Sequence, residues 1–313
     1  MRFMKYIGNG AYCYANSTSM LLSCINEDVS PSLIEVLTGV SIGATLKKDK
    51  NLLYFNNQTL LPDLGLTKAL GILGFTYKIK VFEKPDDFPL EELKKDLTLS
   101  PAVIGPLDMN LLIYNPNYEH LKGADHFILA YKIDNNQIYV HDPAGFPYVS
   151  LSLEKLKESW QANNVSYKKG YYRYTFSPKR VKEPSNAKIY SMAISFFKTI
   201  YLEGEKKTNK SKFAIGGKAI RDYADYISKK GLNEEEWGHF VYFALPLGAK
   251  RASDYATFFK NHNDELSRLK NEQAKIFGES HTLTARRSWK LLSLFFVKLA
   301  KTEDEFRAKL LKT

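Results

Sequence analysis

The segment from Gly123 to Gly145, GADHFILAYKIDNNQIYVHDPAG, constrains the fold of this chain more than any other. Residues 126–133 form an apolar run of strand composition, and residues 138–141 form a second, shorter one. The four residues between them, DNNQ, favour a short turn. We therefore predict an antiparallel hairpin, in which the start of the first strand lies beside the end of the second. His126 and Asp142 are then expected to be neighbours in space.

An imidazole that is held by a carboxylate is a general base suited to a nucleophile, and Cys13 is the candidate nucleophile. Residues 12–24, YCYANSTSMLLSC, carry apolar or small side chains at helical spacing. The predicted helix begins at Cys13, where free backbone N–H groups and the helix dipole stabilise a thiolate and a developing oxyanion. Position alone favours a buried structural cysteine, but the His–Asp hairpin downstream reverses that preference in favour of the nucleophile. Cys24, later on the same helix, is expected to be structural.

Composition excludes several classes of protein. No run of 18 apolar residues occurs, and the first residues, MRFMKYIGNG, lack the apolar core of a signal peptide. The two cysteines lie on one predicted helix, which disfavours a disulfide between them. No CxxC or HExxH motif is present, so we expect no metal site. The sequence thus predicts a cytoplasmic, reduced protein without a cofactor of its own.

The net charge of +11 is concentrated in the C-terminal part. Residues 1–180 carry 20 Lys and Arg against 18 Asp and Glu, whereas residues 181–313 carry 25 against 16. Such an imbalance suggests an acidic partner, and a solvated face is the alternative. No helix-turn-helix pattern supports nucleic acid, and no span supports a membrane. An acidic acyl carrier protein, which brings its own phosphopantetheine, is the partner we expect.

The C-terminal part has a helical pattern. We predict helices over 187–202, 216–230, 249–277 and 282–301, with a lysine-rich loop at 203–212. The N-terminal part combines helices with short strands, such as 75–82, and has a loop of about fifteen residues after Pro106 that we interpret as a lid. We therefore expect two domains, residues 1–182 and residues 183–313.

A helix-borne Cys followed by His and Asp on later strands resembles the papain-like cysteine enzymes. The pattern is more similar to the bacteriocin-processing peptidases, in the residues Cys13, His126-Phe127-Ile128 and Asp142-Pro143. It is most similar to the family of butirosin biosynthesis protein H, through Gly10-Ala11-Tyr12-Cys13, a Gly-rich loop after the second helix, and the hairpin. Beyond residue 150 the resemblance lies in helical character and the segment FAIGGKAIR at 213–221. It implies an α+β, papain-like catalytic domain at 1–182 and a basic, mostly helical domain at 183–313.

The resemblance also suggests supporting residues. The processing peptidases have a Gln shortly before the Cys that completes the oxyanion hole, and no Gln lies between Met1 and Cys13. We expect the Asn9 side chain or the Cys13 backbone N–H to act instead. Gly43, Tyr14 and His120 are candidates for substrate contact. His141 is expected to point away from Asp142 and to serve in packing.

Three hypotheses about function follow. In the first, a thiol acyltransferase takes an acyl group from a thioester onto Cys13 and passes it to the amine or hydroxyl of a small-molecule acceptor. In the second, a cysteine peptidase or amidase uses the same three residues with water as the acceptor. A binding module without catalysis is the third, and the complete Cys, His and Asp set argues against it.

Overall fold

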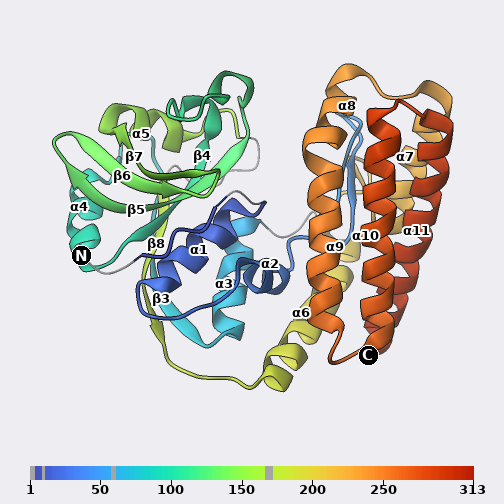
Figure 1. The fold of residues 1–313 in the computed structure, drawn as a ribbon, viewed down its shortest axis with the longest axis horizontal. Coiled ribbons are helices and arrows are strands. Elements are labelled where there is room, and N and C mark those ends of the chain that lie inside the picture. The colour runs from blue at the N-terminus through green and yellow to red at the C-terminus, as the bar shows by residue number, and fades with distance from the viewer. Residues whose placement is uncertain (1–3, 9–10, 58–60, 166–171) are drawn as a thin grey trace. The chain divides into compact units, whose positions relative to one another are not determined.

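The computed structural model describes residues 4–8, 11–57, 61–165 and 172–313. The chain divides into two compact units (Figure 1). The first unit contains Met1–Ile34 and Leu73–Glu183, and the second contains Glu35–Ile72 and Pro184–Thr313. Both combine helices with antiparallel strands, so the fold is α+β. Among the described residues, no helix is long and apolar enough to span a membrane.

A six-stranded antiparallel sheet forms the centre of the first unit, in the order β3-β8-β4-β5-β6-β7. Its strands are β3 (Phe75–Phe82), β4 (Ala102–Asp108), β5 (Asp125–Asp134), β6 (Gln137–Asp142), β7 (Phe146–Ser152) and β8 (Tyr172–Arg180). The helices of this unit are α1 (Cys13–Ser23), α4 (Leu90–Leu99), α5 (Leu153–Gln161) and the 3-10 turns η1 (Met109–Leu111) and η2 (Tyr118–His120). The predicted strand 75–82 is confirmed. α2 (Pro31–Thr38) crosses the boundary between the units.

Helix α1 is surrounded by protein, because every residue from Tyr14 to Leu22 is buried. Its polar side chains are satisfied locally. The hydroxyl of Thr18 donates to the Tyr14 carbonyl oxygen at 2.8 Å, and that of Ser19 donates to the Val29 carbonyl oxygen at 2.5 Å. A buried helix with paired polar groups is held rigidly, which suits an element that carries a reactive group at its first residue.

The predicted hairpin is present as β5 and β6. Asp134 pairs with Gln137, so the turn consists of Asn135 and Asn136 alone, with φ angles of 46° and 62°. Positive φ at both central residues is the geometry of a type I′ turn, which asparagine tolerates better than most residues. The sequence therefore predicted the turn correctly and made it two residues too long.

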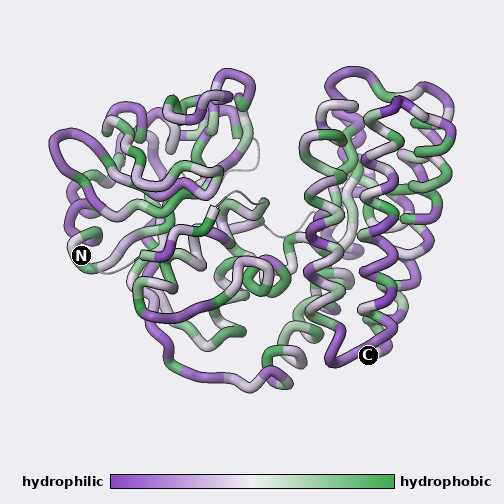
Figure 2. The backbone as a smooth tube through the Cα atoms, in the orientation of Figure 1, coloured by the Kyte–Doolittle hydropathy of each residue, from purple (hydrophilic) through white to green (hydrophobic). Residues whose placement is uncertain are grey.

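The second unit is mainly helical. Its helices are α3 (Pro62–Ile72), α6 (Asn186–Lys207), α7 (Gly216–Lys230), α8 (Glu234–His239), the π-helical turn η3 (Phe240–Ala244), α9 (Leu245–Phe259), α10 (Asp264–Ala285) and α11 (Trp289–Lys312). A small sheet in the order β2-β1-β9 joins β1 (Thr45–Lys47), β2 (Leu52–Tyr54) and β9 (Phe213–Ile215). Hydrophilic and hydrophobic residues alternate along the helices in Figure 2, as expected of helices with one buried face.

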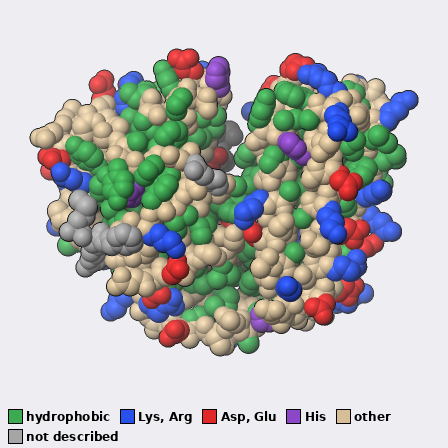
Figure 3. Space-filling model, in the orientation of Figure 1, with side chains coloured by type: hydrophobic (Ala, Val, Ile, Leu, Met, Phe, Trp, Pro, Cys, Tyr) green, Lys and Arg blue, Asp and Glu red, His purple; other side chains and the backbone are tan. Residues whose placement is uncertain are grey.

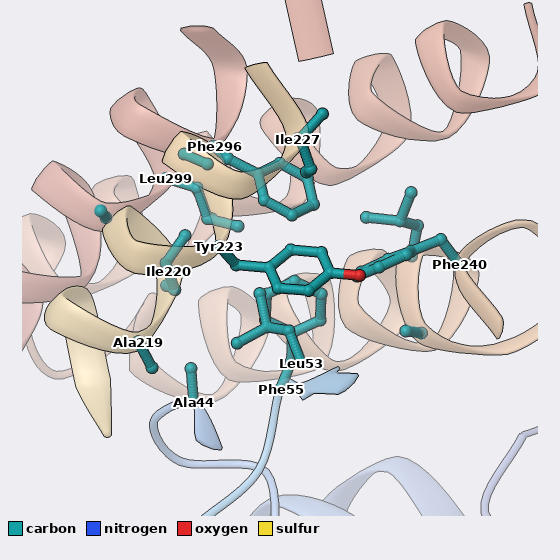
Figure 4. Close-up of a cluster of buried hydrophobic side chains, with 14 of the residues drawn as sticks. Ala44, Leu53, Phe55, Ala219, Ile220, Tyr223, Ile227, Phe240, Phe296 and Leu299 are labelled. Carbon is teal, nitrogen blue, oxygen red and sulfur yellow. The ribbon is translucent and has the colours of Figure 1, made fainter. Parts of the chain in front are cut away.

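The core of the second unit is shown in Figure 4. Tyr223 of α7 lies at its centre, among Phe240, Phe296 and Leu53. Each of these four side chains is 0% exposed. Leu53 belongs to β2, so a strand from the early part of the chain contributes to the core of the C-terminal helices. Burial of this size is worth about 2 kcal/mol for each large side chain.

Residues 35–72 cluster with the C-terminal helices, whereas we expected them in the N-terminal domain. Two interactions explain the difference. β1 pairs with β9, with Thr45 opposite Ile215 and Lys47 opposite Phe213. Glu35 is fully buried and is bonded by the Arg251 Nε at 2.8 Å. Strand pairing and a buried ion pair between segments far apart in the sequence produce no periodic pattern within either segment, so the sequence did not predict this division.

Three helix boundaries also differ from the expectation. The predicted helix 249–277 is two helices, α9 and α10, because Asn263 caps α10 by accepting a hydrogen bond from the Leu266 N–H at 3.0 Å. α6 continues to Lys207, into the first half of the predicted loop, and α11 begins seven residues later than predicted, at Trp289. The prediction of 216–230 is confirmed by α7.

Candidate active site

Cys13 is the first residue of α1. The residue before it, Tyr12, has a φ of 76° in the left-handed region, a conformation that costs a non-glycine residue on the order of 1 kcal/mol. The Tyr12 side chain is only 7% exposed, and its burial offsets that cost. The Tyr12 side chain, at the N-cap position, makes no capping hydrogen bond to α1. Cys13 itself is partly exposed.

His126 lies near the start of β5 and is bonded to Asp142, the last residue of β6. The distance between His126 Nε2 and Asp142 Oδ1 is 2.6 Å, and the two residues are 4% and 0% exposed. Because Nε2 is occupied, the other ring nitrogen, Nδ1, remains for the thiol. The Cys13 side chain lies beside the His126 ring, close enough to help raise the pKa of that imidazole. Cysteine, histidine and aspartate thus form one connected chain of contacts.

A β-bulge places Asp142 on the same face of the sheet as His126. At the turn, Ile133 faces Ile138 and Lys132 faces Tyr139, but further on Ala130 faces Val140 and Leu129 faces His141. Tyr131 is therefore an extra residue in β5. With the bulge, the next pair sets Asp142 opposite Ile128, on the face that His126 shares. Without it, Asp142 would face Leu129 and would point away from His126.

Helix α1 and strand β5 are joined directly beside the site. The Ser17 hydroxyl, one turn after Cys13, donates to the carbonyl oxygen of Phe127, the residue after His126, at 3.1 Å. The ring of Phe127 packs against that of Tyr14 with 5.9 Å between centroids. These contacts fix the position of the Cys13 side chain relative to the His126 imidazole.

The Asp142 carboxylate accepts three hydrogen bonds, from His126, from the Ala144 N–H at 2.7 Å, and from the Tyr114 hydroxyl at 2.8 Å. Burial alone would raise the pKa of this carboxyl. The charge and hydrogen bond of His126, together with the Ala144 and Tyr114 donors, outweigh burial and lower the pKa of Asp142 below its ordinary value. Asp142 is therefore an anion at neutral pH.

The same interactions act on His126 in the opposite direction. Burial disfavours the imidazolium, but the Asp142 charge and hydrogen bond, reinforced by Cys13, raise the pKa of His126 to about 10. The arrangement favours a protonated ring beside the Asp142 carboxylate. A protonated imidazole beside a cysteine is the condition under which a thiolate forms.

Two tyrosines complete the site, and we did not predict either. Tyr114 lies in the loop after Pro106 that we interpreted as a lid, and it donates to Asp142. Tyr6 donates from its hydroxyl to the Asp142 backbone oxygen at 2.8 Å. The only signal in the sequence was the abundance of Tyr in these segments, because contacts across 28 and 136 positions follow from tertiary packing alone.

The remaining predicted site residues have different positions. Asn9 lies outside the described residues. Tyr14 is 5% exposed and packs in the core, so its side chain offers no surface to a substrate, contrary to our expectation. His120 is exposed on η2, and Gly43 belongs to the second unit. His141 packs against Tyr131 and Tyr148, with 5.0 and 4.4 Å between ring centroids. Cys24 is buried and donates to the Met20 carbonyl oxygen.

Comparison with known proteins gives three results. A crystal structure of a Bacillus anthracis chain described as a C39-like peptidase covers 58% of this chain and 98% of that chain, with 13% identity and a TM-score of 0.39, a similarity too low to support a conclusion. Residues 210–311 match the family described as the YobF C-terminal domain. Protein YobF of Bacillus subtilis (strain 168) is 45% identical over 311 residues, which are 99% of both chains. This chain therefore belongs to the YobF family.

Proposed function

We propose that this protein is a papain-like cysteine enzyme that carries an acyl group on Cys13. The observation that supports this proposal is the buried hydrogen bond of 2.6 Å between His126 and Asp142, beside a cysteine at the start of a helix that helps raise the pKa of the same imidazole. Each group has the partner that its role requires: the nucleophile has a base, and the base has an orienting carboxylate.

The reaction would proceed in two half-reactions. The Cys13 sulfur attacks the carbonyl carbon of the donor, and the oxyanion that develops is stabilised by the Cys13 backbone N–H at the helix start. The protonated His126 gives its proton to the leaving group, and the acyl group remains on sulfur as a thioester. An acceptor amine, hydroxyl or water then attacks the thioester while His126 removes its proton, and the Cys13 thiolate returns as the acyl group leaves.

The donor we favour is a thioester, which would make the enzyme an acyltransferase with a small-molecule acceptor. No glutamine lies between Met1 and Cys13 to supply a second oxyanion donor, so we consider the site better matched to an activated acyl group than to an amide. A thiol leaves more readily than an amine, and its expulsion needs less help from His126. An acidic acyl carrier protein would deliver such a donor on its phosphopantetheine arm, and the excess of positive charge in residues 181–313 supports that partner.

The alternative is a cysteine peptidase or amidase. It uses the same three side chains, and water takes the place of the acceptor. The specific reason to keep it is the resemblance of the His126-Phe127-Ile128 and Asp142-Pro143 segments to those of bacteriocin-processing peptidases.

Trapping the acyl-enzyme separates these possibilities. The protein is incubated with a carrier-bound acyl thioester, with the same acyl group on N-acetylcysteamine, and with peptides, and its intact mass is then measured. We expect the mass of the acyl group on Cys13 from the thioesters and none from the peptides. The matched control is Cys24→Ser, which removes the other cysteine of the chain and should still be acylated. An adduct in Cys13→Ala, or no adduct from any donor, would refute covalent catalysis by Cys13.

A further inference from the structure

The first unit contains a buried carboxylate that the proposed chemistry does not use. Acidic side chains are prominent on the surface in Figure 3, whereas Asp108, the last residue of β4, is 0% exposed. Among the described residues, its carboxylate accepts hydrogen bonds from N–H groups alone. A charge removed from water is costly unless such donors compensate it, so these bonds hold the segments that supply them firmly in place.

Three donors surround this carboxylate. Oδ1 accepts from the backbone N–H of Asn110 at 3.2 Å and from that of Gly123 at 3.0 Å. Oδ2 accepts from the side-chain amide of Asn164 at 2.8 Å. Asn110 and Gly123 lie near the two ends of residues 109–124, the loop that connects β4 to β5 (Figure 1), and Asn164 follows α5. Asp108 therefore fastens both ends of this loop and ties them to a third segment.

Two further features bring the ends of the loop together at the same place. The backbone N–H of Met109 donates to the carbonyl oxygen of Ala124 at 3.0 Å. Gly123 has a φ of 76°, and a Cβ placed on it would lie 3.0 Å from the carbonyl oxygen of Asn164. Glycine therefore suits this position in both backbone conformation and space.

The interior of the loop is ordered by its own contacts. Leu112 is 0% exposed and belongs to the hydrophobic core of the first unit. The Asn110 side chain donates to the carbonyl oxygen of Tyr118 at 3.2 Å, and the Asn117 N–H donates to the side-chain oxygen of Asn115 at 3.0 Å. A compact loop with its ends together is an Ω-loop. We interpreted this segment as a lid from its length, and its contacts indicate a fixed part of the unit instead.

The loop carries Tyr114, whose hydroxyl donates to Asp142 Oδ2 at 2.8 Å. The Tyr114 ring also packs against that of Phe146, with 5.8 Å between centroids. Because Tyr114 and the Ala144 N–H both hold the Asp142 carboxylate, its Oδ1 stays directed at His126. The orientation of the candidate base thus depends on where the loop places one hydroxyl.

We propose that Asp108 is a positioning residue of this site. Its carboxylate fixes both ends of the loop, and the loop in turn holds the Tyr114 hydroxyl on Asp142. The residue before it, Leu107, pairs with His126 in the sheet, so the same anchor relates the loop to the strand that carries the base. This role rests on the proposed function, because it takes Asp142 as the carboxylate that orients His126.

Amide hydrogen exchange of the full-length protein tests the anchor. In Asp108→Ala, the segments that contain Asn110 and Gly123 should exchange about tenfold faster, the equivalent of one hydrogen bond to a charged group. Asp108→Asn keeps one oxygen for both backbone N–H groups, and the Asn164 amide can turn to accept from the introduced amide, so slow exchange should be retained. Asn164→Ala removes a single donor and should give a smaller increase. Unchanged exchange in Asp108→Ala, or in Asn164→Ala if the former does not fold, would overturn the anchor.

The matched control is Asp96→Ala. Asp96 is a second buried carboxylate of this unit, bonded by the Tyr174 hydroxyl of β8 at 2.7 Å and by the Lys80 ammonium of β3 at 2.7 Å. Its loss should lower Tm but leave the exchange of the loop and the alkylation of Cys13 unchanged, because neither partner belongs to the loop or to the site. Equal acceleration of loop exchange in Asp96→Ala and Asp108→Ala would show a general loosening of the unit and overturn the anchor.

Alkylation of Cys13 by iodoacetamide needs no substrate and tests the link to the site. Protonation of Asp142 removes the partner of the imidazolium, so the acid limb of the alkylation rate depends on the pKa of Asp142. Asp108→Ala and Tyr114→Phe should both move this limb to higher pH, because each takes the Tyr114 donor from Asp142 and so raises its pKa. The double variant should move it no further than Tyr114→Phe alone, since Asp108 acts through that hydroxyl.

The outcomes separate a positioning role from a structural one. His126 and Tyr6, the other titratable groups bonded to Asp142, are kept in these variants. Faster loop exchange in Asp108→Ala without a shift of the acid limb, or a further shift in the double variant, would overturn the positioning role. Alkylation of His126→Ala at the wild-type rate would instead refute the proposed function, and the exchange data would still decide whether Asp108 anchors the loop.

Discussion

The two units each bury a charged cluster, and the clusters differ in what they leave unbonded. In the first unit Asp142 is fully partnered, but His126 keeps one nitrogen for a thiol that is partly exposed. In the second unit, Lys270 donates to Gln273 at 2.9 Å, and Gln273 donates to Glu303 at 3.1 Å.

In this second cluster, which consists of Lys270, Gln273, Glu303 and Tyr201, the polar groups bond one another. Tyr201 donates to the other oxygen of Glu303 at 2.6 Å, and the Lys270 ammonium lies 3.9 Å from the Phe306 ring centroid. Its charged groups are therefore bonded to one another within the fold. The difference teaches that burial of charge is not itself a sign of catalysis. The useful sign is a buried pair that orients one remaining group toward a reactive, accessible atom.

The largest effect is expected when the candidate nucleophile of the first unit, Cys13, is replaced. Cys13→Ala should lower turnover by a factor of about a thousand or more, since the covalent step is lost. The thermal unfolding transition should change little, because Cys13 is only partly buried. Steady-state assay with the acylating thioester measures the first quantity, and calorimetry the second. Activity of one tenth of wild type would exclude the covalent mechanism.

Removal of the base should have the next largest effect. We expect His126→Ala to slow alkylation of Cys13 by iodoacetamide at pH 7 by about a hundredfold, within the range of general base catalysis. Asp142→Asn should be milder, because an amide can still orient the ring although it lacks the charge. Equal alkylation rates in wild type and His126→Ala would show that thiol and imidazole do not interact.

A substitution in the cluster around Lys270 should change the stability of the protein and leave the reactivity of Cys13 unchanged. Lys270→Met leaves Glu303 buried without its cation and should lower the free energy of unfolding by about 3 kcal/mol. Lys275→Met is the control, since Lys275 is exposed on the same helix and should be near neutral. Urea denaturation gives the stabilities, and the alkylation rate of Cys13 should equal that of wild type in both variants. A slower alkylation in Lys270→Met would contradict the distinction between the two clusters.

Tyr114→Phe should have a smaller effect on the site formed by Cys13, His126 and Asp142. The hydroxyl of Tyr114 helps lower the pKa of Asp142, so its removal should raise that pKa. A lowered carboxyl pKa contributes stability above its unfolded value, and this contribution is lost as pH falls through the folded value. The acid limb of kcat/KM, and the acid limb of stability, should therefore both move to higher pH. Tyr118→Phe, on the same loop but bonded to Glu119, should shift neither.

Local sequence patterns predicted the parts of the site that depend on local chemistry. Strand composition and the Asn-Asn turn indicated the hairpin, and helical spacing placed Cys13 at the first residue of α1. The alignment of His126 with Asp142 depends in addition on the bulge at Tyr131. Tyrosine is common in regular strands, so nothing in the sequence distinguishes a bulge from a continuous ladder. The contact between His126 and Asp142 was therefore predicted correctly, but the prediction did not include the bulge that places both side chains on one face of the sheet.

The division of the chain was less predictable. Residues 35–72 contribute Leu53 and Phe55 to the core of the C-terminal helices, although composition gave no reason to separate them from their neighbours. The break between α9 and α10 depends on the single cap at Asn263, within a run of otherwise helical pattern. Interactions over long sequence distances and single capping residues are the features that periodicity does not report.

The smallest expected effect concerns the proposed carrier protein. Several cations of residues 181–313 are already paired, including Lys207 with Glu203 and Lys218 with Asp222. Lys206, Lys210 and Lys212 are exposed without such an ion pair among the described residues, so they would contribute most to the attraction of an acidic partner. Attraction between exposed charges acts mainly on the rate of encounter, and it weakens as salt shortens the Debye length to about 10 Å at 0.1 M.

Reversal of these three lysines to Glu should therefore lower kcat/KM for a carrier-bound thioester several-fold at low salt, and much less at high salt. The control reverses Lys229, Lys275 and Lys290, which are also exposed, and so changes net charge equally. An N-acetylcysteamine thioester, which has no acidic surface, should react at the same rate with all three proteins. If both triple variants slow the carrier equally, only net charge matters and no docking patch exists. If neither slows it, the basic half is a solvated surface, and the proposed acyltransferase must take its donor in another form.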